Sequence, residues 1–463
     1  MKRFAALSIV SVFLVCSAVH PATDNVKLPP FSKVQLKNGM TLLLMEQTEV
    51  PIISFSFILK AGSVADPKGK EGVASLTADL LRKGTRTRTS EQIAGDLDFI
   101  GGEFDMTATT DMTAGSAEFL KKDILQGLDL ITDILLNPTF PDEEVKKLID
   151  QRIDGIKAEK DRAGGVIGRY FNSYLFGSHP YARPVGGDET SLAAITRADV
   201  QAFYIAQYVP GNMIMAVAGD FVTAEMRAMI EQRFSGWPAK AVPPIRLDPP
   251  APATGKRLLL VDKPDSTQTY FYIGNRGISR TNQDRIPIIV VNTLFGGRFT
   301  SRLNTALRVD SGLTYGASSI WDQRKLPGPF FITTYTRNAT TEKAMDMALD
   351  VLRNFYEKGI TQEELNSAKA YLKGQFPTSI ETTNQLASAM ARLEFYGLDE
   401  NDINTYAQKV DAMTLDEARR VIRQYFPLDN LVFVMIGKAS EIESVAKKYA
   451  PRIDRKSITQ PGF

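Results

Sequence analysis

The sequence is poor in the residues that most often carry metal, thiol or redox chemistry. Its 463 residues include two histidines and one cysteine. Cys16 and His20 lie close to the N-terminus, so the chain beyond them has no thiol and one imidazole, that of His179. Disulfide bonds and thiol catalysis are therefore excluded for that part of the chain. A metal site with two histidine ligands is excluded as well, because a hydrolytic zinc ion is held mainly by neutral imidazoles.

The sequence also has no strong excess of charge and no long apolar run. Lysine and arginine total 55, and aspartate and glutamate total 53, which argues against the clustered basic surface that nucleic-acid binding requires. The apolar run from Phe4 to Val15 is too short for a comfortable membrane span, and no later stretch is long enough. We therefore expect no nucleic-acid partner and no membrane span. The composition, 43% hydrophobic and 23% charged, is that of an ordinary globular protein with ample core.

The N-terminus has the pattern of a secretory signal. Lys2 and Arg3 precede the apolar run, and small residues follow it up to Ala18. We assign residues 1–22 to this signal peptide, expect cleavage after Ala18, and predict a secreted protein located in the periplasm. Lipidation of Cys16 is the alternative, but Val15 precedes it where a lipoprotein signal has a small residue.

The remaining chain contains a weak internal repeat. The pattern Gln-Tyr-x-Pro, followed by an asparagine and an apolar run that ends at a glycine, occurs over residues 207–219 and again over residues 424–437. The spacing from the asparagine to the glycine is the same in both copies. Two further pairs of similar segments run in the same order, which indicates a duplicated domain.

A segment rich in proline and alanine separates the two copies. It covers residues 238–255, where prolines remove amide donors and favour an extended backbone, and we predict that it is a semi-rigid linker. The predicted domains are residues 23–237 and residues 256–450. Residues 451–463 are left as a tail.

Each half mixes strand and helix patterns. Met40–Met45 and Ile52–Leu59 are apolar or alternating runs of strand length, whereas apolar residues between 124 and 135 recur at helical spacing. Capping-box sequences at Thr361–Glu364 and Thr414–Glu417 mark helix starts. The predicted fold class is α+β, with two homologous domains that each have a mostly antiparallel sheet and helices packed on one face.

One segment carries a resemblance to a known family. Gly72-Val-Ala-Ser-Leu-Thr-Ala-Asp-Leu-Leu-Arg-Lys-Gly-Thr85 resembles the zinc-binding helix of the pitrilysin/insulinase peptidases (family M16), in which His-x-x-Glu-His stands between Gly-Leu-Ala and Leu-x-x-Gly-Thr. In that register Ser75 and Asp79 replace the two histidines, and Ala78 replaces the glutamate that acts as general base. The resemblance implies two LuxS/MPP-like domains, as in the mitochondrial-processing-peptidase branch (M16B), and no metal bound by this chain.

The third zinc ligand of active family members falls near Gly155 and Ile156 in this chain. The neighbouring carboxylates, Asp154 and Glu159, are out of register, so we interpret this helix as structural. His179 stands in a turn-like segment and is expected to bond to the backbone rather than to a metal. Hydrolysis by this chain alone would require a displaced metal site.

The second half carries the other signature of the resemblance. Arg308 ends a Leu-Arg segment, and Tyr315 follows it in Gly-Leu-Thr-Tyr. In the family these two residues reach the substrate beside the zinc ion. Arginine offers rigid donors to a peptide carbonyl or carboxylate, and a tyrosine hydroxyl can donate to the oxyanion that forms on hydrolysis. The nearby pair Gly296 and Gly297 either permits close approach of a peptide backbone or only forms a tight turn.

The resemblance implies a division of labour between two chains. Family members of this length pair with a second subunit and enclose a peptide, and in some pairs one chain carries the zinc motif while the other keeps the arginine and tyrosine. The leading hypothesis is a non-catalytic subunit of a heterodimeric zinc peptidase, whose zinc-bearing partner is an M16 homologue and whose substrates are peptides. The alternative is a peptide-binding or assembly scaffold that takes no part in hydrolysis.

Overall fold

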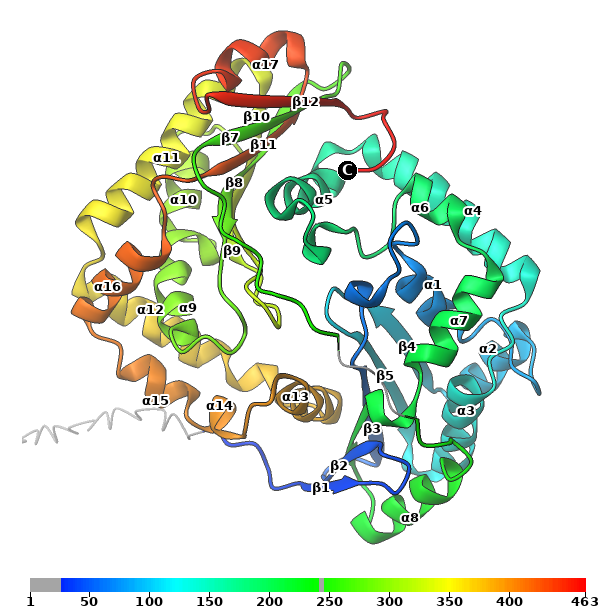
Figure 1. The fold of residues 1–463 in the computed structure, drawn as a ribbon. Coiled ribbons are helices and arrows are strands. Elements are labelled where there is room, and N and C mark those ends of the chain that lie inside the picture. Colours follow the sequence, from blue (N-terminus) through cyan, green and yellow to red (C-terminus); the bar gives the residue numbers. More distant parts are fainter. Residues whose placement is uncertain (1–25, 241–244) are drawn as a thin grey trace, which may run out of the picture.

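The structure, a computed structural model, describes residues 26–240 and 245–463. The predicted signal peptide, residues 1–22, lies outside these ranges. The described chain forms two halves, each built around a six-stranded sheet (Figure 1). Within the described residues, no helix is both long and apolar enough to cross a membrane.

The first sheet has the strand order β1-β2-β6-β3-β5-β4. Only β2 and β6 run parallel, and the other neighbouring strands are antiparallel. The strands are β1 (Ser32–Gln35), β2 (Thr41–Glu46), β3 (Ile52–Leu59), β4 (Glu103–Ala108), β5 (Thr113–Leu120) and β6 (Met213–Gly219).

The second sheet has the order β12-β7-β11-β8-β10-β9. It follows the first sheet strand for strand from β7 to β11, with the β7–β11 pair parallel and the β8, β10 and β9 pairs antiparallel. The strands are β7 (Arg257–Asp262), β8 (Gln268–Arg276), β9 (Ala317–Trp321), β10 (Pro329–Arg337), β11 (Val432–Gly437) and β12 (Arg452–Ser457). The repeated asparagine-to-glycine segments become β6 and β11, so the predicted duplication and the α+β fold class are confirmed.

Helices connect the strands of each half. Those of the first half are α1 (Val73–Leu80), α2 (Ser90–Phe99), α3 (Ile124–Leu136), α4 (Asp142–Lys160), α5 (Ala163–Phe176), α6 (Glu189–Ala194), α7 (Arg197–Gln207) and α8 (Thr223–Arg233). Those of the second half are α9 (Arg285–Asn292), α10 (Arg302–Asn304), α11 (Thr341–Lys358), α12 (Gln362–Gln375), α13 (Thr383–Tyr396), α14 (Asn401–Asn404), α15 (Tyr406–Asp411), α16 (Leu415–Tyr425) and α17 (Ala439–Ala446).

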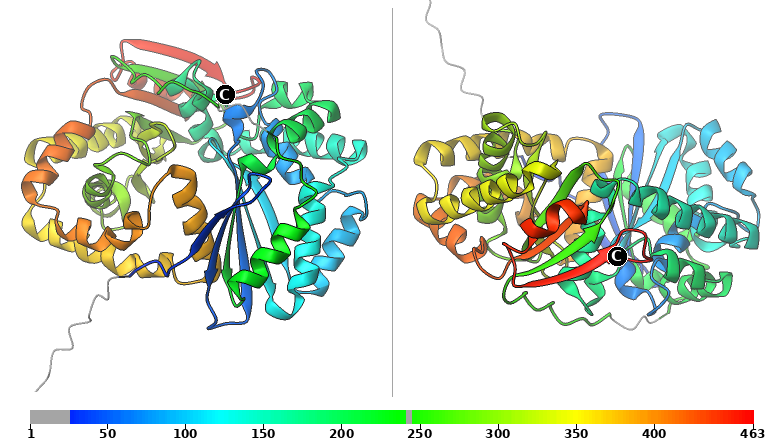
Figure 2. Two further views of the ribbon diagram at one scale, coloured as in Figure 1. Left: turned by 60° about the horizontal axis from the view of Figure 1, so that its bottom comes forward. Right: turned by 90° about the horizontal axis from the view of Figure 1, so that it is seen from above.

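The two halves exchange one helix each, so that a helix of each half packs on the sheet of the other half. Most helices pack on one face of their own sheet, as predicted, and form the two large cores. The opposite face of the first sheet is covered by α13, which packs on β3 and β6, whereas α5 covers β8 and β11 of the second sheet (Figures 1 and 2). The prediction of helices on one face was therefore incomplete, because helical periodicity marks an apolar stripe without naming the sheet that covers it.

The exchange explains why β3 is buried along almost its whole length. It is covered on both faces, so seven of its eight residues are buried, including the polar Ser54 and Ser56. The buried Ser54 makes a polar contact across the halves, because its hydroxyl lies 2.7 Å from that of Thr383 on α13. The same hydroxyl lies 2.7 Å from a carboxylate oxygen of Glu118 on the neighbouring strand β5.

The last residues also join the halves. Residues 451–463, predicted as a tail, include β12, which pairs in parallel with β7, and then cross to the helices of the first half. There the ring of Phe463 packs against that of Tyr170, with 5.3 Å between their centroids, and its carbonyl accepts a hydrogen bond from Ser173 at 3.0 Å. This segment therefore ties the second sheet to α5 of the first half.

Candidate functional site

Helix α1 carries the positions that correspond to the zinc motif, and a buried carboxylate holds its start. Gly72 precedes the helix with φ of 101°, and a side chain there would meet the carbonyl oxygen of Gly186 at 2.9 Å, so glycine is required. The carboxylate of Asp66 accepts hydrogen bonds from the amides of Gly72, at 2.7 Å, and Ala74, at 2.9 Å. Asp66, six residues before the N-cap position Gly72, thus satisfies free amides at the start of the helix as an N-cap side chain would.

Asp66 gives the first half a specific pH dependence. Burial raises the pKa of Asp66 from 3.8 to about 7, although the two amide hydrogen bonds oppose the shift. Between the two pKa values the folded protein holds a proton that the unfolded chain releases, so stability is highest at low pH and falls as pH rises. We expect this carboxyl to remove about 2 kcal/mol of unfolding free energy between pH 5 and pH 7.

Urea unfolding of the wild type and of Asp66→Asn, at each pH, measures this effect. The amide does not titrate, so the difference between the two proteins should change with pH by about the same 2 kcal/mol. A constant difference over this range would show that Asp66 is ionised throughout.

The three degenerate positions lie on α1 beside an arginine of α4. Ala78 is 2% exposed, whereas the side chain of Asp79 is 40% exposed and forms an ion pair with Arg152. The same Nη2 of Arg152 donates to the carbonyl oxygen of Ser75 at 3.2 Å. A guanidinium therefore bridges the two positions where the family has histidines.

The surroundings of this pair do not suit a metal ion. Within the described residues, no three His, Cys, Asp or Glu side chains gather in a way that could hold one. The carboxylates of the predicted third-ligand region are engaged elsewhere: Glu159 pairs with Arg169 at 2.5 Å and Asp154 with Lys157 at 3.0 Å. A cationic guanidinium beside Asp79 also repels any cation, so the residues present do not fit zinc.

Arg152 is not among the residues that the sequence indicates for this site. It lies in α4, one turn before Gly155 and Ile156, and its side chain is only 17% exposed. Its charge is the feature that could have pointed to it. Asp79 stands where the family has a histidine, and an arginine near the third-ligand position favours an ion pair with that carboxylate.

His179 caps a turn, as the sequence indicated. Its Nδ1 accepts from the amide of Tyr181 at 3.0 Å, and its Nε2 lies 3.0 Å from the carbonyl oxygen of Asp248 in the linker. Both ring nitrogens are thus used by the backbone.

Arg308 and Tyr315 lie in the second half, Arg308 in the turn that follows α10 and Tyr315 just before β9. Arg308 belongs to a π-helical turn, Thr305–Asp310, an irregularity that often occurs at functional sites. Its guanidinium carbon lies 4.6 Å from the ring centroid of Phe299, and Tyr315 is 78% exposed. Among the described residues, no hydrogen bond or ion pair engages either side chain or joins it to the α1 positions, so both can meet a ligand or a second chain.

The glycine pair has a packing role. A side chain at Gly296 would lie 2.4 Å from the Oγ of Ser319, so glycine allows the π-helical turn after α9, Thr293–Gly297, to pack tightly on β9. Gly297 is exposed, and its Cβ would approach the carbonyl oxygen of Asn292 at 3.0 Å. The contacts therefore account for Gly296 without a bound peptide.

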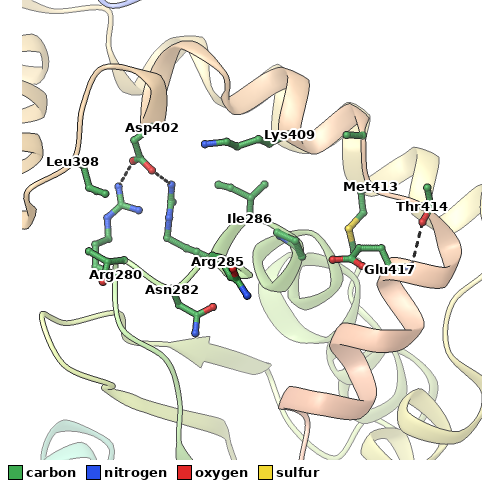
Figure 3. Close-up of a pocket in the computed structure, with 14 residues that line it drawn as sticks. Arg280, Asn282, Arg285, Ile286, Leu398, Asp402, Lys409, Met413, Thr414 and Glu417 are labelled. Carbon is green, nitrogen blue, oxygen red and sulfur yellow. Dashed lines mark hydrogen bonds and ion pairs between the residues drawn. The ribbon is translucent and has the colours of Figure 1, made fainter. Parts of the chain in front are cut away.

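A cavity of about 570 Å³ lies apart from both the degenerate zinc positions on α1 and the Arg308 and Tyr315 pair. It opens between the start of α9 and the helices α14 to α16, where Asp402 accepts from Arg280 at 2.7 Å and from Arg285 at 2.5 Å (Figure 3). Arg285 is 9% exposed. The network fixes the segment that follows the exchanged helix α13 to the body of the second half.

Two family profiles match the sequence. One, described as insulinase (peptidase family M16), covers residues 42–189, and the other, described as peptidase M16 inactive domain, covers residues 194–372. The chain belongs to peptidase family M16. It is a member without the His-x-x-Glu-His motif, and the match spans both halves of the duplicated fold.

Curated relatives support the assignment. An uncharacterized zinc protease of Mycobacterium leprae is 28% identical over 85% of this chain and 88% of its own length. An uncharacterized zinc protease of Bacillus subtilis is 24% identical over 85% of this chain and 95% of its own length.

Solved structures share the fold. The crystal structure of a peptidase M16 inactive domain from Pseudomonas fluorescens has a TM-score of 0.83 and 26% identity, covering 88% of this chain and 98% of its own. The first half of the periplasmic protease PqqL of Escherichia coli has a TM-score of 0.72 and 16% identity, covering 92% of this chain and 98% of its own.

Proposed function

We propose that this protein is the non-catalytic subunit of a secreted, periplasmic heterodimeric M16 peptidase, which binds peptide substrate and completes the active site of a zinc-bearing partner. The observation that carries the proposal is the Arg152–Asp79 ion pair, which places a guanidinium between the positions where active members hold zinc. The partner's zinc ion, when bound, supplies an activated water.

Arg308 and Tyr315 are the groups that this chain contributes to the reaction. Neither side chain is held by a hydrogen bond or ion pair of the described residues, and Tyr315 is largely exposed. The Arg308 guanidinium can bind a carbonyl or carboxylate of the substrate. The Tyr315 hydroxyl can donate a hydrogen bond to the oxyanion that develops when water attacks the peptide carbon.

The periplasmic location rests on two observations of different kinds. The N-terminal residues have the order of a secretory signal. In addition, the fold neighbour PqqL is described as a periplasmic protease.

The second candidate is a peptide-binding or assembly scaffold with no role in hydrolysis. It is favoured by the exposed apolar side chains next to Arg308, namely Phe299 and Val309, each 64% exposed. A pull-down separates the two, because an M16 homologue with the zinc motif should be recovered with the peptidase subunit and unrelated proteins with the scaffold.

Reconstitution tests the peptidase proposal. The purified mature chain should neither hold zinc nor cleave peptides, and mixing it with the zinc-bearing homologue should give an activity that neither chain shows alone. Elemental analysis of the separate chains should find the metal in the homologue. Hydrolysis by this chain alone with one tightly bound metal ion, or a partner that is fully active alone, would refute the division of labour.

A further inference from the structure

A hollow of about 410 Å³ lies where the two halves and the linker meet. Its size is typical of small-ligand pockets. The first half contributes Lys60, Val64 and Asp111, the β9–β10 connection of the second half contributes Lys325 and Leu326, and the linker contributes residues 245–248. The site therefore exists only when the two halves are joined.

Lys60 is the unusual group in this hollow. It follows β3, is half-buried, and its ammonium makes no hydrogen bond or ion pair with the described residues. Burial lowers the pKa of Lys60, and the charges of Lys325 and Lys33 add to the effect, while Glu394 opposes it. A half-buried ammonium without a partner is partly desolvated at a cost, and an anion that reached it would offset that cost.

Two of the carboxylates near Lys60, Glu394 and Asp111, already have partners. Glu394 pairs with Lys33 at 2.6 Å. Asp111 accepts from the hydroxyl of Tyr181 and from the amide of Lys325, each at 2.7 Å, and so closes the junction between the halves. Glu394 and Asp111 are therefore held by other groups. Asp248 also lines the hollow, but of the described carboxylates only Glu394 acts on the pKa of Lys60.

The lining as a whole favours an anion with an aliphatic stem. The cations Lys60, Lys325 and Arg246 outnumber the carboxylates Asp111 and Asp248. The lining also includes the apolar side chains of Val64, Ile245, Leu247 and Leu326.

We propose that this hollow binds a side-chain carboxylate of a peptide, with Lys60 as its counter-ion, and so gives the protein a preference for acidic peptides. The inference rests on the proposed function in that it takes a peptide as the ligand. The glutamate stem fits the apolar lining, and its carboxylate reaches the ammonium that the protein leaves unpaired.

Two labelled peptides and four proteins test the preference. The peptides have one sequence with amidated C-termini and differ only in glutamate against glutamine, and binding to the isolated mature chain is followed by fluorescence anisotropy at low salt. The wild type should bind the glutamate peptide about 10-fold more tightly, the scale of one hydrogen bond to a charged group. Lys60→Gln should abolish the preference and leave the affinity for the glutamine peptide unchanged.

Two further variants separate a local site from net charge and from misfolding. Lys37→Gln removes an exposed lysine between β1 and β2 and should retain the preference. Lys60→Arg keeps the positive charge and should retain most of it. Equal affinities of the wild type for both peptides would overturn the inference while leaving the reconstitution result untouched. Loss of the preference in Lys37→Gln would also overturn it, and failure of both peptides to bind would overturn the inference and the peptide-binding part of the proposed function.

Discussion

Replacing Arg308 by alanine is expected to slow peptide hydrolysis by the reconstituted pair by about 100-fold, the scale of losing one donor to the transition state. The loss should appear in kcat, because a guanidinium bound to the scissile carbonyl donates more strongly as that carbonyl oxygen gains negative charge in the transition state. Among the described residues, the ring of Phe299 is the one charged or aromatic partner of the Arg308 side chain. Removing that side chain should therefore change the unfolding free energy of this chain by less than about 1 kcal/mol.

The matched control is Arg337→Ala, which removes an exposed arginine at the end of β10 in the same half. Steady-state kinetics of the pair with either variant, alongside thermal unfolding of each chain, separates a catalytic effect from a folding effect. An Arg308→Ala pair as fast as the wild type would remove the proposed role in trans, whereas equal losses in both variants would point to net charge.

Replacing Asp402 by alanine is expected to destabilise the protein by about 3–5 kcal/mol. Asp402 is the shared partner of Arg280 and Arg285, and the Arg285 side chain is nearly buried (Figure 3). Removing the carboxylate leaves two guanidinium groups close together with no counter-ion, and one of them has little access to water. Because Asp402 follows α13 along the chain, the loss should also loosen the helix that covers the first sheet.

Chemical denaturation measures the stability change, and hydrogen exchange of the amides in α13 measures the loosening. Asp350→Ala is the control, because its ion pair with Arg353 is more than half exposed on both sides and should contribute less than about 0.5 kcal/mol. A change for Asp402→Ala no larger than that of the control would show that the cations are solvated in the folded state.

The fold class could be predicted from sequence because its signals are local or repeated. Strand alternation, helical spacing and the duplicated Gln-Tyr-x-Pro pattern each depend on residues close together in the chain, and the two sheets follow from them. The C-terminal segment of residues 451–463, with β12 and Phe463, could not be predicted in this way. Its strand is short and charged, and its pairing partner, β7, lies far back in the sequence.

Part of the candidate site could also be predicted from the sequence, and part depended on the fold. Ser75, Ala78 and Asp79 could be placed on one helix from their spacing, and the lack of imidazole followed from composition alone. That Arg152 would meet Asp79, and that Asp66 would cap α1, required α4 and the preceding loop to be docked. Nothing in the sequence distinguishes Lys60 as a binding residue, because a lysine after a strand is ordinarily solvated.

The sequence by itself therefore determined the duplicated α+β architecture, the absence of a two-histidine metal site and the survival of Arg308 and Tyr315. The tertiary structure alone decided which half covers which sheet, which cation neutralises Asp79, and that Lys60 is half-buried without a partner among the described residues. The physical reason is that periodicity and composition act over a few residues, whereas burial and charge pairing depend on surfaces brought together from distant parts of the chain.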